Sequence, residues 1–151
     1  MPACAEAMRR SGVSDALLES IRRGTPVLGI CVGLQILFER GVEAGGARGL
    51  GLVPGTVERL PEGVKLPHIG WSPVRAALPA LHPLFAPLDG QYVYFAHSFA
   101  APAGAPGAQL LARHGADYCA ALARGNLFAV QFHPEKSQQV GLAFLRRFVE
   151  V

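Results

Sequence analysis

A cysteine between two glycines is the first residue of this sequence that could do chemistry. The stretch Gly29–Gly33 reads GICVG, and it lies where an apolar run, Pro26–Ile30, gives way to a stretch with helical spacing. Cys31 is therefore expected at a tight strand-to-helix turn, in the G-x-nucleophile-x-G form of a nucleophile elbow. N–H groups at the start of a helix favour a thiolate, and the N–H of Val32 could donate to an oxyanion. Read alone, the pattern fits a buried structural cysteine equally well.

A thiol nucleophile needs a base, and the base needs a group that orients it. Of the five histidines, His133 is the one with an acid placed to help, because the stretch AVQFHPEKS puts Glu135 two residues after it. Residues two apart in an extended segment face the same way, and Pro134 stiffens the spacing. His133 follows an apolar strand and is therefore expected at the same sheet edge as Cys31. A surface histidine and glutamate at a strand end is the alternative.

Gln35 follows Cys31 by four residues, one helical turn, and so shares its helix face. A glutamine on the buried side of the stretch LQILF needs polar partners. It is interpreted either as a core amide satisfied by protein groups or as a contact to a polar substrate above the thiol. The other histidines, His68, His82, His97 and His114, receive no catalytic role.

Two helices and one strand must hold this front part of the site. The sequence predicts a helix from Ser14 to Gly24, a strand over residues 26–30 and a short helix from Cys31 to about Glu39. A Gly-rich loop is expected over residues 41–51, and the stretch AAPAGAPGA over residues 100–108 is expected to be an exposed loop.

Strands dominate the rest of the predicted chain. They are expected over residues 57–60, 69–74, 92–95, 109–112, 118–123 and 127–132. A closing amphipathic helix over residues 140–151 has as its expected inner face Phe144, Leu145, Phe148 and Val149. The predicted fold class is α/β, a mostly parallel open sheet flanked by helices with an antiparallel extension.

Composition narrows the class of protein. The 151 residues, half of them apolar, fit one domain with a sizeable core. The net charge of +3 comes from scattered basic residues, which argues against a nucleic-acid stripe. The three cysteines form no C-x-x-C pair, which disfavours a zinc site or a disulfide framework and indicates a reducing, cytoplasmic compartment. No leader or membrane span is expected.

Together, GICVGLQ and QFHPEKS resemble the class I (triad-type) glutamine amidotransferases. The stretches RGLGLVPGTVERL, KLPHIGW and VYFAHSF resemble one branch of that class, the glutaminase subunits of imidazole glycerol phosphate synthases in histidine biosynthesis. This resemblance implies that Cys31 attacks the side-chain amide of glutamine, that His133 is the base and acid, and that Glu135 orients it. Ammonia would pass to a barrel-shaped cyclase subunit in a heterodimer, with no cofactor or metal.

The resemblance also assigns residues around the triad. Those implied to bind glutamine are Val32, Gln35, Glu43, Ser98 and Phe99. Those implied to face the cyclase are Pro67, His68, Trp71 and Lys136, with plain core as the alternative for Trp71.

The chain departs from this family at its front. The family carries roughly fifty residues before the position of Met1, about two strand–helix units, with a Pro-Gly-x-Gly stretch that completes the oxyanion hole. The prediction is therefore a single amidotransferase type-1 domain over residues 1–151, lacking its N-terminal part. Two alternatives stay open: a non-catalytic fragment, and the glutaminase domain of another amidotransferase, serving GMP or anthranilate synthesis.

Overall fold

The computed structural model describes residues 1–151, and helices dominate only the front of the chain. α1 (Pro2–Arg10) and α2 (Val13–Arg22) come first, and β1 (Val27–Ile30) leads into the one-turn helix α3 (Val32–Gln35). The later elements are β2 (Phe38–Gly41), η1 (Glu43–Gly45), β3 (Ala47–Arg48), β4 (Val53–Arg59), β5 (His68–Pro73), β6 (Arg75–Ala76), η2 (Ala86–Leu88), β7 (Tyr92–His97), β8 (Phe99–Pro102), β9 (Ala108–His114), β10 (Ala116–Arg124), β11 (Leu127–Val130), η3 (Pro134–Lys136) and α4 (Gln138–Val149).

The strands form one large mixed sheet and one two-stranded sheet. The large sheet runs β1-β11-β10-β8-β4-β2-β3, with β9 joining β10 to β6, and the small sheet pairs β5 with β7. Only the β1–β11 and β2–β4 ladders are parallel. The predicted α/β class with flanking helices is confirmed. The prediction of a mostly parallel sheet is wrong, because seven of the nine strand pairings are antiparallel.

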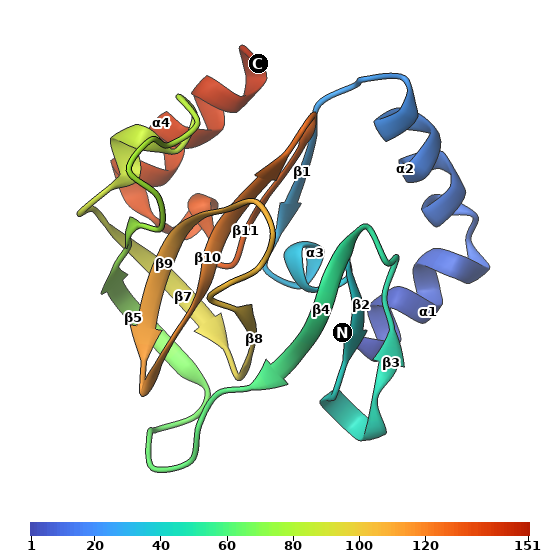
Figure 1. The fold of residues 1–151 in the computed structure, drawn as a ribbon, viewed down its shortest axis with the longest axis horizontal. Helices are drawn as coiled ribbons and strands as arrows, with labels where there is room; N and C mark the ends of the chain where they lie inside the picture. Colours follow the sequence, from blue (N-terminus) through green and yellow to red (C-terminus); the bar gives the residue numbers. More distant parts are fainter.

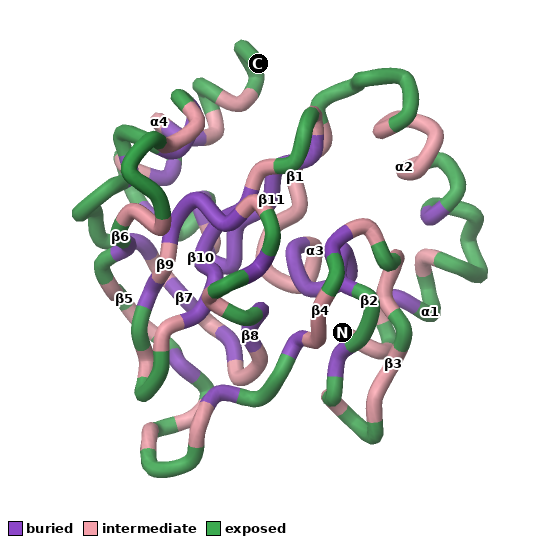
Figure 2. The backbone as a smooth tube through the Cα atoms, in the orientation of Figure 1, coloured by how far each residue is buried: buried purple, intermediate pink, exposed green.

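The helices lie on opposite sides of the molecule (Figure 1). α1 and α2 lie beyond β2 and β3, whereas α4 packs at the other end, near β7 and η3. Figure 2 shows that burial is concentrated in the strands and α3, while α1 and α2 are mostly exposed or half-buried. Only Ala5 of α1 and Ser14 of α2 are buried. None of the helices is both long and apolar enough to cross a membrane.

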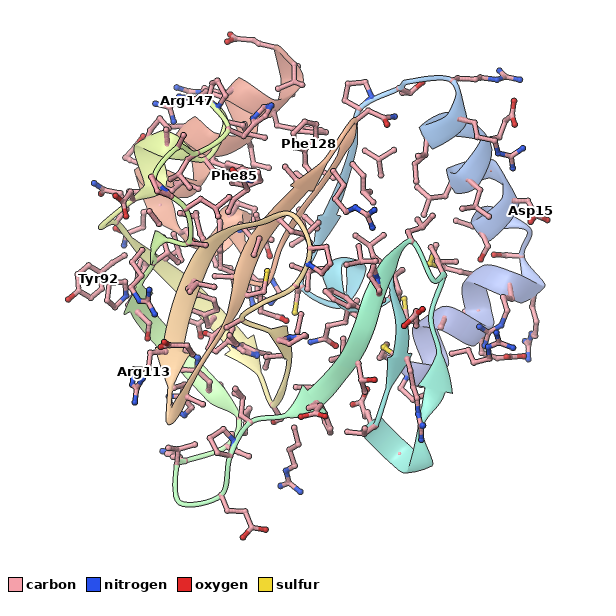
Figure 3. The ribbon with its side chains drawn as sticks, viewed as in Figure 1. Asp15, Phe85, Tyr92, Arg113, Phe128 and Arg147 are labelled. Atoms are coloured by element: carbon pink, nitrogen blue, oxygen red, sulfur yellow. The ribbon has the colours of Figure 1, made fainter.

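The core consists of two apolar clusters. The larger contains 17 buried residues, mainly from β7, β9, β10, β11 and α4. The smaller contains 12, in which residues around α3, β2 and β4 pack against residues of β8 to β11. In the larger cluster the Phe85 ring packs near that of Phe128, with centroids 6.3 Å apart (Figure 3). The Phe144 ring lies 5.7 Å from Phe85. Through Phe128, this packing anchors β11, the strand that leads to the histidine of the predicted site, against α4.

Several predicted boundaries are wrong, each for a local reason. The helix after Cys31 ends at Gln35 and not near Glu39, because Phe38 and Glu39 enter β2, which pairs with β4 and β3. The Gly-rich segment over residues 41–51 is not all loop, since it contains η1 and β3. The helix predicted from Ser14 begins at Val13, after Gly12, whose positive φ of 75° suits a glycine N-cap.

Two predictions about burial are also wrong. The stretch over residues 100–108 is not an exposed loop, because Ala101 pairs with Cys119 in the β8–β10 ladder and is buried, as is Ala105. Val149 is 84% exposed and does not belong to the inner face of α4, whereas Phe144, Leu145 and Phe148 pack on the core as predicted.

Candidate active site

Cys31 lies at a strained turn between β1 and α3, as the sequence predicts. Its φ of 52° and ψ of −105° are unusual for a residue with a side chain, and its N–H donates to Val130 O at 2.8 Å. Such a backbone conformation costs about 1–3 kcal/mol and is typical of active sites. The turn also explains Gly29, because a Cβ there would lie 2.8 Å from the carbonyl oxygen of Gly33.

The parallel β1–β11 ladder brings His133 to the same sheet edge as Cys31. Its last pair joins Ile30 to Val130, so Cys31 follows one strand by one residue and His133 follows the other by three. The His133 N–H donates to Tyr94 O at 2.8 Å, and this bond ties the histidine to β7. The topology therefore unites two residues that lie about a hundred positions apart.

Glu135 orients the His133 ring through a hydrogen bond of 2.8 Å between His133 Nδ1 and Glu135 Oε1. The two residues do not lie in the extended segment that the sequence predicts. Glu135 belongs to the 3-10 turn η3, which begins at Pro134, where the fixed φ of proline suits the first helical position. Since the carboxylate can only accept, Nδ1 carries the proton and Nε2 of His133 is left free to accept one.

The pKa of the Cys31 thiol is raised above its usual value, because burial of the sulfur is the largest influence and the Glu135 charge adds to it. The N–H of Val32 and the side-chain amide of Gln131 both act in the opposite direction on this pKa, but they do not outweigh burial. The predicted thiolate stabilisation by the helix start is therefore too weak, since α3 is one turn long.

A cavity of about 310 Å³ opens beside Cys31. Its lining contains Met1, Cys31, Val32, Gln35, Glu43, Pro67, Ala96, His97, Ser98 and Phe99. All five residues that the sequence resemblance assigned to glutamine binding thus lie around one space next to the thiol. Within it, Glu43 accepts an ion-pair contact from the amino terminus of Met1. A larger, open depression of about 760 Å³ between α1 and residues 46–49 contains no nucleophile.

Gln131 is a candidate site residue that the sequence reasoning missed. It is fully buried, its Nε2 lies 3.6 Å from Cys31 Sγ, and its Oε1 accepts from Gln35 Nε2 at 3.1 Å. Gln35 Nε2 also donates to the carbonyl of Phe99 at 2.8 Å. The signal in the sequence was a lone polar residue interrupting the apolar run before His133.

The comparisons with known proteins agree with this geometry. The model of the glutamine amidotransferase class-I family matches residues 6–151. The chain belongs to this family.

Several relatives support a narrower assignment within the amidotransferases. A protein of Synechococcus sp. (strain JA-3-3Ab) is 47% identical over 95% of this chain and 68% of its own length, and one of Syntrophotalea carbinolica is 42% identical over 96% and 74%. A protein of Thermus thermophilus is 44% identical over 96% of this chain and 72% of its own length. All three are named imidazole glycerol phosphate synthase subunit HisH.

A solved structure supports the amidotransferase fold separately. The crystal structure of a glutamine amidotransferase superposes with a TM-score of 0.68, covering 97% of this chain and 71% of that one, at 22% identity. The overall fold of the chain is therefore similar to that of a glutamine amidotransferase.

The residues that the resemblance placed toward a partner divide into two groups in this amidotransferase. Pro67, Trp71 and Lys136 are exposed, so Trp71 is not core. The prediction that the His68 side chain faces a partner is wrong, because this side chain is buried. His68 is only 5% exposed, and its Nδ1 lies 3.2 Å from the hydroxyl of Tyr118. Alternation along β5 explains the difference, since His68 and Trp71 fall on opposite faces of the strand.

Proposed function

We propose that this amidotransferase is the glutaminase subunit of an imidazole glycerol phosphate synthase. It hydrolyses glutamine to glutamate and ammonia and passes the ammonia to a cyclase subunit in histidine biosynthesis. The observation that carries the proposal is the strained Cys31 elbow at the same sheet edge as the His133–Glu135 pair, with the five glutamine-binding candidates around the cavity at Cys31. The names of relatives at 42–47% identity support the pathway.

In the first step, Cys31 Sγ attacks the side-chain amide carbon of glutamine. Because burial raises the pKa of the Cys31 thiol, the sulfur enters the reaction protonated, and His133 Nε2 takes its proton as the bond to carbon forms. Glu135 keeps the proton of the imidazole on Nδ1 and stabilises the imidazolium that results. The N–H of Val32 is the donor available near the developing oxyanion.

In the second step, the imidazolium gives its proton to the leaving nitrogen, and ammonia departs from a glutamyl thioester. A water molecule, deprotonated by His133, then attacks the thioester carbon. The C–S bond breaks, the thiol regains its proton, and glutamate leaves. Each step uses the same three side chains, so loss of Cys31 removes the whole sequence of reactions.

An exposed aromatic strip on the two-stranded sheet supports the cyclase as a partner in a heterodimer. Ile69 and Trp71 of β5 are 62% and 43% exposed, and Tyr92 of β7 is 59% exposed and projects outward (Figure 3). Trp71 stands edge-on to Tyr94, and the Lys136 ammonium lies 5.8 Å from the Tyr94 ring centroid. Aromatic residues rimmed by charge are typical of protein interfaces. The free cysteines support a cytoplasmic location as part of the same proposal.

The test is glutamate release from glutamine by the purified chain, with and without the cyclase subunit and its ribotide substrate. Turnover that requires Cys31 and rises with the cyclase is the expected result, and Cys31→Ala is the control that should bind the cyclase with unchanged affinity. Equal turnover by Cys31→Ala, or no turnover with the cyclase bound, would contradict the proposal. Stimulation by a GMP or anthranilate synthase instead of the cyclase would reassign the pathway.

A further inference from the structure

Three buried side chains behind the cavity form a hydrogen-bonded chain that the hydrolysis mechanism above does not use. His68, His97 and Tyr118 are 5%, 6% and 2% exposed, and they come from β5, β7 and β10. The Tyr118 hydroxyl lies 3.2 Å from His97 Nε2 and 3.2 Å from His68 Nδ1. Buried polar groups in such a chain must all be satisfied at once, which fixes their tautomers.

The direction of the chain follows from its end at the active site. His97 Nδ1 lies 2.9 Å from the carbonyl oxygen of Phe99, and since a carbonyl only accepts, Nδ1 carries the proton. The Nε2 atom of neutral His97 then accepts from the Tyr118 hydroxyl. Tyr118 oxygen in turn accepts from His68 Nδ1–H.

The far end of the chain closes on a serine. His68 Nε2 is left as an acceptor, and the Ser72 hydroxyl lies 2.9 Å from it and donates. Each ring nitrogen of His68 and His97 thereby has one hydrogen-bond partner. Reversing any one of these bonds would leave two donors or two acceptors facing each other.

The surroundings keep the chain neutral. The pKa values of His68 and His97 are both lowered to about 4, mainly by burial and in smaller part by the nearby His114. Burial likewise raises the pKa of the Tyr118 hydroxyl. The ionisable groups that face the chain are His114, stacked on His68 with centroids 4.1 Å apart, and His133, whose charge also acts on His97. Both disfavour a charge on the chain.

The hydrogen-bonded chain of His68, Tyr118 and His97 ends at the Phe99 carbonyl, which is linked to the nucleophile. The Phe99 carbonyl that accepts from His97 also accepts from Gln35 Nε2, whose amide holds Gln131 beside Cys31 Sγ. Both N–H groups of the Gln35 amide are thus occupied, which leaves its Oε1 as the atom available to a ligand in the cavity. His97 itself lines that cavity.

We propose that His97 is a positioning residue for glutamine binding and hydrolysis, held in its Nδ1–H tautomer by Tyr118 and His68 so that it fixes the Phe99 carbonyl and, through it, Gln35. The proposal rests on the proposed glutaminase function. It assigns a role to one residue of the cavity lining, His97, and to two buried residues behind it.

Two substitutions of His97 separate this role from a structural one. Asparagine places an N–H₂ group at the position of Nδ1 and keeps the bond to Phe99, whereas glutamine reaches the Nε2 position and keeps only the bond to Tyr118. Tyr118→Phe removes the donor to His97 Nε2, so that only the bond to the Phe99 carbonyl still favours the Nδ1–H tautomer of His97. Phe85→Leu is the matched control for lost packing, because Phe85 belongs to the same apolar cluster as Tyr118 but takes no part in the hydrogen-bonded chain.

Steady-state glutaminase kinetics are measured with the cyclase bound, at equal folded concentrations. His97→Gln and Tyr118→Phe are expected to raise KM for glutamine about tenfold, while His97→Asn and Phe85→Leu stay within about threefold of the wild type. In the His97→Asn background, Tyr118→Phe is expected to cost nothing more, because asparagine has no tautomer to release. Unchanged KM in Tyr118→Phe, or equal losses in His97→Asn and His97→Gln, would overturn the proposal.

A readout without activity keeps the proposal separable from the glutaminase function. Nitrogen-15 NMR of the free chain between pH 5 and 8 is expected to show His68 and His97 as neutral Nδ1–H tautomers throughout, and His97 as a mixture of tautomers in Tyr118→Phe. An Nε2–H tautomer of His97 in the wild type, or titration of His97 near pH 6.5, would contradict the proposed hydrogen bonds between His97, Tyr118 and His68. It would do so even if the protein hydrolyses glutamine. The expected spectra without any turnover would refute the glutaminase function and, with it, the positioning role.

Discussion

At the scale of single residues, the site depends on how burial competes with hydrogen bonding. Cys31 is deep enough that desolvation outweighs the donors Val32 and Gln131, so its thiol stays protonated near neutral pH. His133, in contrast, is held by the Glu135 carboxylate, whose side chain is half exposed to solvent. The nucleophile therefore rests as a thiol.

This resting state predicts how Cys31 reacts with iodoacetamide. Because the pKa of Cys31 is raised, its alkylation in the free chain should stay slow at pH 7–8 and accelerate as the pH is raised further. Mass spectrometry of timed digests measures the rate, with Cys119, which is fully buried, as an unreactive internal reference. A rate already at its plateau at pH 7 would show a thiolate and contradict the prediction.

The residues of the site differ in how far the sequence reveals them. Cys31, His133 and Glu135 lie in short local motifs. Their residue types and spacing therefore identify them from the sequence alone. His97 and Tyr118 are ordinary strand residues in sequence, and their link exists only because β7 and β10 fold together. Their role follows from contacts between distant segments, which no local pattern encodes.

At the scale of elements, the strands with continuous apolar residues are predicted well, whereas the short strand β8 is not. β7, β9 and β11 contain aromatic or branched residues and lie where the sequence places them. β8 reads FAAP, and a loop is predicted over most of it because alanine, glycine and proline carry little strand preference of their own. Its pairing with β10 and β4 overrides that preference.

The elbow predicts opposite outcomes for two alanine substitutions. Gly29→Ala puts a Cβ 2.8 Å from the Gly33 carbonyl, and this clash should cost about 1–3 kcal/mol of the free energy of unfolding and displace Cys31. Gly33→Ala meets nothing within 4 Å and lies inside α3, where alanine is preferred by up to about 1 kcal/mol.

Urea unfolding and glutaminase activity check this pair. Gly29→Ala should lose both stability and turnover, and Gly33→Ala should keep both. Equal behaviour of the two variants would mean that the close approach of the two backbones does not shape the elbow.

At the scale of the whole molecule, the small β5–β7 sheet has a different role on each of its faces. The outer face of β5 and β7 is expected to meet the cyclase, and their inner face carries the histidine chain. The strand β5 therefore contributes residues both to the outer face and to the buried hydrogen-bonded chain.

Trp71→Ala should weaken binding of the cyclase without unfolding the chain. The side chain is 43% exposed and pairs edge-on with Tyr94, so it is an anchor whose loss should cost about 2 kcal/mol, more than tenfold in Kd. Isothermal titration with the cyclase measures the effect, and Val149→Ala, at an 84% exposed position of α4, is the control. Equal affinities of the two variants would place the interface elsewhere.

Stability should fall in mild acid because of the buried histidines. Unfolded histidines take up protons below about pH 6.5, whereas burial holds the pKa of His68 and His97 at about 4 in the fold. Between pH 6.5 and 4 the unfolded state binds more protons, so the free energy of unfolding decreases as pH falls, by at most about 3 kcal/mol for each histidine. Urea unfolding across this range should show a shallower decrease for His97→Asn, and identical slopes would contradict the assignment.

The four-residue ladder between β1 and β11 also has a kinetic meaning. β1 pairs with β11 over four half-buried residues, and these few hydrogen bonds hold the nucleophile and the base in register. A ladder this short is expected to open locally at a lower free energy than the core, so its amides should exchange with deuterium sooner. We expect each such opening to take Cys31 away from His133 while α4 and its aromatic cluster stay folded. A ligand that keeps the ladder closed would then raise the fraction of molecules in which the two residues are in register.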